Sequence, residues 1–155
     1  MALDAEVGVI GFGDAGISVA GSGGVPALPS TYGRVLPGYP RSFAANAPDL
    51  AIYLEGQNDP HGTDARGLGR VICALLAAAP GNNHLVLAPL SGRNSAATRA
   101  ALAEVASAHV VWHGTSGWIA ASSDTCDGVH PHARAHRTRI APKIIALVRR
   151  LLPAR

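Results

Sequence analysis

The chain has 155 residues, of which 48% are hydrophobic and only 15% are charged. This length buries one core and is too short for two ordinary domains, so a single domain over residues 1–155 is expected. The composition excludes a disordered chain and a coiled coil. No apolar run reaches the roughly 18 residues of a membrane span, and no signal-peptide pattern opens the sequence. We therefore expect a soluble protein, either secreted or cytoplasmic.

The first half of the chain predicts two strands separated by a long loop. Residues 6–12 form a short β-branched run that ends in glycines, which is typical of a buried parallel strand. In residues 13–40, Gly, Ser and Pro recur at short intervals and exclude a long helix, so an irregular functional loop is expected. The apolar, β-prone run 49–56 predicts the second strand.

The second half alternates helix and strand. Apolar residues three and four apart predict a helix over 63–79, followed by a strand over 84–90. A second helix is predicted over 94–108, capped by Asn94 or Ser95, and a fourth strand over 109–114.

The last helix is expected to begin at Pro131 and to be bent or broken by Pro142. Strands that alternate with helices in this way predict right-handed βαβ units and a parallel sheet. Ligand sites are then expected in the loops after the carboxyl ends of the strands.

Residues 11–16 spell G-x-G-x-x-G directly after the first predicted strand, which is the pattern of a dinucleotide-binding turn. In that motif the last glycine opens a helix whose N-terminus binds the pyrophosphate. Here the residues after Gly16 exclude a helix, and no acidic residue ends a second strand about 20 residues further on. No nicotinamide, flavin or other cofactor is therefore expected.

Two further motifs lie at loop positions. Residues 56–59 read Gly-Gln-Asn-Asp after the second strand, and residues 127–131 read Asp-Gly-Val-His-Pro before the last helix. In this order and at these places, G-x-N-D and D-x-x-H-P resemble the third and fifth conserved blocks of the SGNH, or GDSL, esterase family. Residues 11–16 are similar to the second block, with Gly in place of Asn and Ala in place of Ser. The resemblance covers almost all of this chain but only the later part of the family domain.

The resemblance implies an ester hydrolase site. Gly16 and Asn58 would donate hydrogen bonds to the oxyanion, His130 would be the general base and acid, and Asp127 would orient it. The spacing of three residues between Asp127 and His130 lets the carboxylate hold one imidazole nitrogen while the other faces a nucleophile. Without the resemblance, Asn58 is a turn residue and Asp127 a helix cap.

The nucleophilic serine of the first family block has no counterpart here. Only residues 1–5 precede the first predicted strand, and a parallel crossover takes a dozen or more residues. In the alternative alignment, residues 12–15 are the first block and Ala15 replaces the serine. Ser18 and Ser22 are substitute candidates near Gly16, although loop hydroxyls are more common than nucleophiles. A serine from another chain or from an upstream segment is the remaining possibility.

Other chemistry is less favoured. His130, His132 and His136 suggest a metal site, but no H-E-x-x-H accompanies them and a solvated helix face explains the last two. Seven of the thirteen basic residues lie between positions 134 and 155, yet no aromatic residue is interleaved to stack on bases, so no nucleic-acid partner is expected. Cys73 and Cys126 could pair only in an oxidising compartment.

The resemblance thus implies a three-layer α/β/α sandwich with a parallel sheet, of the flavodoxin-like SGNH type, without its first strand and helix. The implied reaction is hydrolysis of an acyl or acetyl ester, on a carbohydrate or small lipid, through a serine acyl-enzyme. The alternative is a catalytically silent remnant that binds a ligand or a protein. An exposed sheet edge left by the absent strand predicts a homodimer that covers it.

Overall fold

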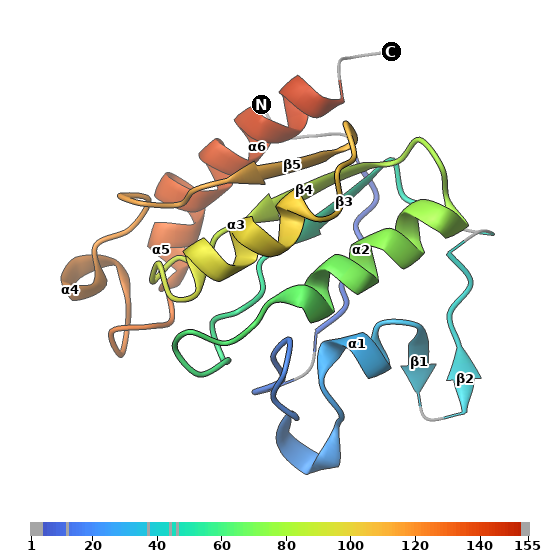
Figure 1. The fold of residues 1–155 in the computed structure, drawn as a ribbon. Coiled ribbons are helices and arrows are strands. Elements are labelled where there is room, and N and C mark those ends of the chain that lie inside the picture. The colour runs from blue at the N-terminus through green and yellow to red at the C-terminus, as the bar shows by residue number, and fades with distance from the viewer. Residues whose placement is uncertain (1–4, 12, 37, 44, 46, 153–155) are drawn as a thin grey trace.

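The computed structural model describes residues 5–11, 13–36, 38–43, 45 and 47–152. Its main sheet has three parallel strands in the order β3-β4-β5 (Figure 1). The strands are β3 (Leu50–Tyr53), β4 (Asn83–Leu87) and β5 (Val110–His113). In the ladder, Ile52 is paired with Leu85 and Leu85 with Val111. The predicted parallel sheet is confirmed for these strands.

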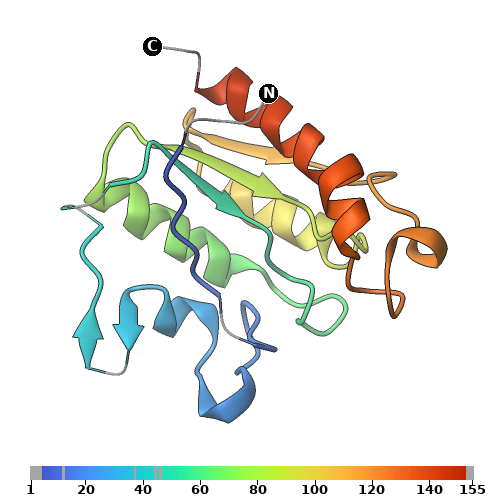
Figure 2. The same cartoon turned by 180° about the vertical axis from the view of Figure 1, so that it is seen from behind.

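Helices cover both faces of the sheet (Figures 1 and 2). One face carries α2 (Arg66–Ala78) and α3 (Ser95–Ala103), and the other carries α6 (Ala141–Leu151). Side chains alternate along β4, so Val86 packs with α2 and α3 while Leu85 and Leu87 pack with the C-terminal helix. Burial of both faces explains why β4 is almost continuously apolar. The fold is mixed α/β with a parallel sheet.

The strand predicted over residues 6–12 is wrong. Residues 5–11 have no strand structure, and residue 12 lies outside the described residues. Val7 and Val9 are 77% and 84% exposed, so this β-prone run buries too little apolar surface to hold it against β3. The open edge of β3 therefore stays without a ladder partner in the described part of the chain.

Residues 13–40 contain only short elements, as predicted. They are η1 (Ser22–Gly24), α1 (Leu28–Thr31), β1 (Arg34–Leu36) and β2 (Tyr39–Pro40), the last two forming an antiparallel pair. Residue 37, between the two strands, is not described. No helix among the described residues is long and apolar enough to cross a membrane.

The end of the chain departs from the prediction at two prolines. Pro131, predicted to begin the last helix, forms an isolated bridge with Thr125, and the first helical residue is Ala133. Short helices α4 (Ala121–Asp124) and α5 (Ala133–Ala135) lead into a π-helical turn, η2 (His136–Ile140), and then into α6. Pro142 lies in the first turn of α6 and does not break the helix. A π turn shifts the hydrogen-bond register just before the proline, where an α-helix would otherwise lose a bond.

Candidate functional site

Hydrogen bonds to the buried carboxylate of Asp59 hold the loop of residues 13–18 in place. Asp59, in the loop after β3, is only 1% exposed. Its oxygens accept hydrogen bonds from the backbone N–H groups of Ile17 and Ser18, at 2.8 and 2.7 Å, and from Ser18 Oγ at 2.7 Å. A Cβ on Gly16 would lie 2.6–2.9 Å from the atoms of this carboxylate. Only glycine therefore fits at position 16. Asp59 was not among the predicted site residues.

The loop after β3 is fixed in turn by Asn94. This residue is buried in the left-handed region at φ 55°, and its Nδ2 donates to Gly56 O at 3.0 Å and to Asp59 O at 3.3 Å. Its Oδ1 accepts from Gly62 N at 2.8 Å. Asn94 was predicted as a cap of α3, but its side chain makes no cap bond to that helix. Instead it cross-links the loop of residues 56–62.

The two predicted oxyanion donors, Asn58 and Gly16, meet at one peptide. Asn58 Nδ2 donates to Ala15 O at 2.9 Å, which places the side chain beside the Ala15–Gly16 peptide. The N–H of Gly16 donates to Val19 O at 3.0 Å. The structure thus places Asn58 beside this peptide, but the peptide is trans, so its C=O and N–H point in opposite directions and the two donors do not converge on one point. Each donor already has an intramolecular acceptor.

The other predicted pair, Asp127 and His130, is directly bonded. His130 Nδ1 lies 2.6 Å from Asp127 Oδ2, and Asp127 Oδ1 accepts from the N–H groups of His130 at 2.7 Å and Val129 at 3.0 Å. The side chains of His130 and Asp127 are 80% and 53% exposed. The carboxylate and imidazole therefore have a fixed mutual geometry, and Nε2 is left on the exposed side of the ring.

Each member of this pair shifts the pKa of the other. Hydrogen bonds from the backbone and side chain of His130 hold the pKa of Asp127 well below its usual value. The hydrogen bond and negative charge of Asp127 raise the pKa of His130, and the charge of Asp14 raises it further.

This coupling predicts a pKa change in Asp127→Asn. The pKa of His130 should lie above 6.5 in the wild-type chain and fall in the variant, because the charge that stabilises the imidazolium is gone. Any reaction that needs neutral His130 as a base should rise with pH through this pKa, and its profile should move to lower pH in the variant. NMR titration of the His130 ring measures the shift. Asp64→Asn is the matched control, and equal His130 titrations in wild type and Asp127→Asn would contradict the coupling.

Neither substitute nucleophile is bonded to His130 among the described residues. Ser18 Oγ donates to Asp59, as above, and Ser22 Oγ donates to Asp14 Oδ2. Asp14 was not among the predicted site residues. In the structure its φ is 60°, a strained backbone conformation for a residue other than glycine.

His132 has a structural role. Its Nδ1 accepts from Ala135 N at 3.0 Å and so caps α5, while Nε2 lies 2.9 Å from Ser123 O. With Nδ1 as acceptor, Nε2 carries the proton and donates to this carbonyl. Both nitrogens are occupied, and the described residues contain no group of three His, Cys, Asp or Glu side chains that could hold a metal ion. Cys73 and Cys126 are both exposed and unpaired thiols.

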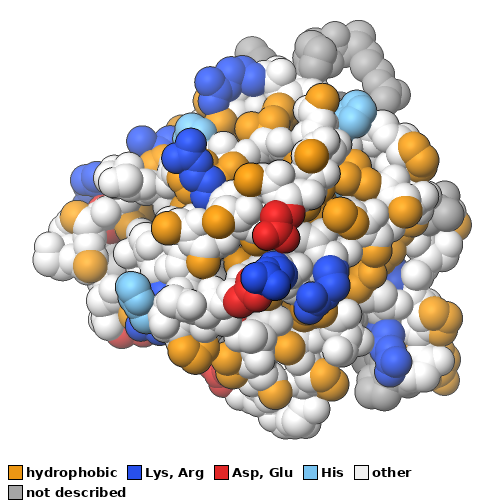
Figure 3. Space-filling model, in the orientation of Figure 1, with side chains coloured by type: hydrophobic (Ala, Val, Ile, Leu, Met, Phe, Trp, Pro, Cys, Tyr) orange, Lys and Arg blue, Asp and Glu red, His pale blue; other side chains and the backbone are white. Residues whose placement is uncertain are grey.

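Basic side chains of the C-terminal segment contact the fold. Arg139 Nε lies 3.2 Å from Oδ1 of Asp124, whose other oxygen accepts from Ala120 N at 2.7 Å. The ammonium of Lys143 lies 5.8 Å from the ring centroid of Trp118. On the opposite face, over α2 and α3, basic side chains are scattered among acidic and apolar ones (Figure 3), and they are arginines because the only lysine is Lys143.

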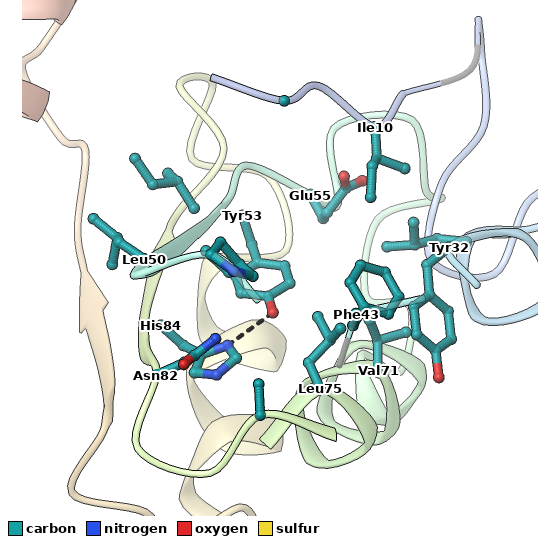
Figure 4. Close-up of a pocket in the computed structure, with 16 residues that line it drawn as sticks. Ile10, Tyr32, Phe43, Leu50, Tyr53, Glu55, Val71, Leu75, Asn82 and His84 are labelled. Carbon is teal, nitrogen blue, oxygen red and sulfur yellow. Dashed lines mark hydrogen bonds between the residues drawn. The ribbon is translucent and has the colours of Figure 1, made fainter. Parts of the chain in front are cut away.

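A second region of interest is a cavity of about 190 Å³ along the open edge of β3. Residues 8–10, α1, α2 and β3 line it (Figure 4). Its lining includes four titratable side chains: Tyr32, Tyr53, Glu55 and His84. Burial, and secondarily the charge of Asp59, raises the pKa of Glu55 to about 7. Tyr53 Oη lies 2.9 Å from Nδ1 of His84.

Glu55→Gln is expected to change how stability depends on pH. Glu55 keeps its proton up to about pH 7 in the folded chain, against an ordinary value of 4.5. Between these values the unfolded chain binds fewer protons, so the free energy of unfolding falls as pH rises from 4.5 to 7. The variant removes this fall and should be more stable than wild type by about 2 kcal/mol at pH 8, with little difference at pH 4. Urea unfolding at both pH values measures it.

The matched control is Glu104→Gln, since Glu104 is exposed on the far end of α3. It should keep the wild-type pH dependence. If the free energy of unfolding of wild type and of Glu55→Gln changed equally with pH, the Glu55 carboxyl would not be held in its protonated form.

Comparison of the chain with protein-family models, with curated protein sequences and with solved structures gave no match.

Proposed function

We propose that the chain carries the acid-base and oxyanion half of an SGNH-type serine esterase. The observation that carries this proposal is the Asp127–His130 pair, bonded at 2.6 Å and exposed at the carboxyl end of the sheet. A carboxylate that holds one imidazole nitrogen fixes the tautomer, so that Nε2 can take a proton from a hydroxyl. The raised pKa of His130 agrees with stabilisation of the imidazolium that forms.

The proposed reaction uses Asn58 and Gly16 as the oxyanion donors. In it, a serine Oγ attacks the ester carbonyl while His130 Nε2 takes its proton. For the oxygen that becomes negative to accept hydrogen bonds from both donors, Asn58 Nδ2 leaves Ala15 O and the Ala15–Gly16 peptide turns so that Gly16 N leaves Val19 O. His130 returns the proton to the leaving alcohol, and water then hydrolyses the acyl-serine.

The identity of the nucleophilic serine is a separate part of the proposal. The candidates within the chain are Ser22, which bonds to Asp14, and Ser18, which bonds to the buried Asp59. Ser22 is favoured because the charge of its partner Asp14 helps to raise the pKa of His130 and the bond between Ser22 and Asp14 is exposed. A serine from another chain is the alternative. We further propose that the fold is the flavodoxin-like, three-layer α/β/α sandwich of this family, and that the substrates are acyl or acetyl esters of a carbohydrate or small lipid.

Hydrolysis of p-nitrophenyl acetate by the purified chain tests the proposal, because a short activated ester can react without fitting a specific substrate pocket. Turnover with an acetyl adduct on a serine, located by mass spectrometry after rapid quenching, is the expected result. Substitution of that serine by alanine should remove both adduct and turnover. A chain that neither turns over nor becomes acetylated would refute an esterase within these residues.

A second candidate function is a catalytically silent module that binds a partner through the edge of β3. The observation that favours it is that Ile52 and Leu54 at this edge are 45% and 43% exposed, with no strand paired beside them in the described residues. A homodimer that pairs two such edges is expected under this alternative. Light scattering at high concentration should then give twice the monomer mass, and a monomer would count against it.

A further inference from the structure

The turn of residues 125–131, which carries Asp127 and His130, is closed by contacts between its own two ends. The N–H of Cys126 donates to His130 O at 3.0 Å, and Thr125 forms an isolated antiparallel bridge with Pro131. These contacts give the turn its shape. Where the turn lies relative to the sheet therefore depends on the residues that flank it.

His132, directly after the turn, bonds to the elements on both sides of it. Its Nε2 donates to Ser123 O at 2.9 Å, in α4, and its backbone N–H donates to Asp124 O at 3.0 Å. Its Nδ1 accepts from Ala135 N at 3.0 Å, at the start of the helical segment α5–η2–α6. One side chain thus connects the element before the turn with the helix after it.

Buried contacts fix both of these elements. The carboxylate of Asp124 is buried and bonds to Ala120 N at 2.7 Å and to Arg139 Nε at 3.2 Å. In the helical segment, Ala135 and Ile140 are buried, and Ile140 belongs to the core on the α6 face of the sheet. Because the turn begins on one fixed element and ends on the other, a bond between the two sets its position.

We propose that His132 is a positioning residue of the site, which holds the Asp127–His130 turn in place by using both of its ring nitrogens at once. This role rests on the proposed function, since it places His130 for proton transfer. A displacement of about 1 Å can cost on the order of 100-fold in rate, so a residue that does not touch the substrate can still control the reaction. A helix cap alone would need only Nδ1.

Three substitutions separate the two bonds of the ring. In His132→Asn the side-chain oxygen can replace Nδ1 and keep the bond to Ala135, whereas in His132→Gln the side-chain amide can replace Nε2 and keep the bond to Ser123. His132→Ala keeps neither. NMR titration of His130 in each variant should give a pKa lower than in wild type and closer to 6.5, because a turn that is not held at its base spends part of its time without the Asp127 bond.

Hydrolysis of p-nitrophenyl acetate supplies the second measurement. In all three variants kcat should fall at least about tenfold, while KM changes less than about twofold, because His132 acts only through His130. His136→Ala removes an exposed histidine of the same segment and should match wild type in the His130 titration and in kcat.

Circular dichroism establishes that each variant is folded, and His132→Asn and His132→Gln decide the question if His132→Ala is not. A wild-type titration of His130 in both would overturn the proposal. Full recovery of the titration and of kcat in His132→Asn would also overturn it, because His132 would then be only a helix cap. If the pKa of His130 falls in the variants but the wild-type chain does not hydrolyse the ester, the positioning role stands and the proposed esterase fails.

Discussion

Replacement of His130 by alanine is expected to lower hydrolysis of p-nitrophenyl acetate at least about 100-fold, within the range that general acid–base catalysis contributes. The variant loses the group that takes the proton from the nucleophile and returns it to the leaving alcohol. Its fold should be retained, because the imidazole is 80% exposed and bonds only to Asp127 through its side chain. Initial rates of purified wild type and variant, at equal concentration and across pH, measure the effect.

His136→Ala is the matched control, since His136 is an exposed histidine of the same segment. It should keep wild-type activity. Equal activities of wild type and His130→Ala would remove the Asp127–His130 pair from the mechanism, whereas equal loss in both variants would point to a general disturbance of the segment. Asp127→Asn should also lose activity, since the ring would no longer be held in the productive tautomer.

Replacement of Asp59 by alanine is expected to lower the free energy of unfolding by about 3 kcal/mol. The carboxylate is 1% exposed and satisfies two backbone N–H groups and one hydroxyl. Its removal leaves the buried N–H of Ile17 without a partner and frees the loop of residues 13–18. Urea unfolding followed by circular dichroism measures the loss, and hydrolysis should fall as well because Gly16 lies in this loop.

Glu104→Ala serves as the control, since Glu104 is an exposed acidic residue just after α3. Surface substitutions of this kind usually change stability by less than about 0.5 kcal/mol, so this variant should stay close to wild type. Gly16→Ala tests the same contact from the other side, because its Cβ would collide with the Asp59 carboxylate. If both changes act there, the double variant should lose less stability than the sum of the single variants. A strictly additive result would contradict a shared contact.

The sequence by itself determined the elements that carry strong apolar periodicity. The strands near 50–53, 83–87 and 110–113 and the helices α2 and α3 were all predicted within a few residues of their observed ends. The pairing of Asp127 with His130 was also predictable, because both lie within four residues and a tight turn suffices to join them. These features depend on neighbours in the chain, which the sequence displays directly.

Only the tertiary structure decided the features that depend on distant partners. Residues 6–12 were predicted as a strand, but a strand needs a ladder and a buried face, and the described residues have neither. Asp59 fastens a loop 42 residues away, and the cavity behind Glu55 joins segments from residue 8 to residue 84. Such contacts arise from packing and polar pairing between segments far apart, and local sequence patterns do not encode which segments meet.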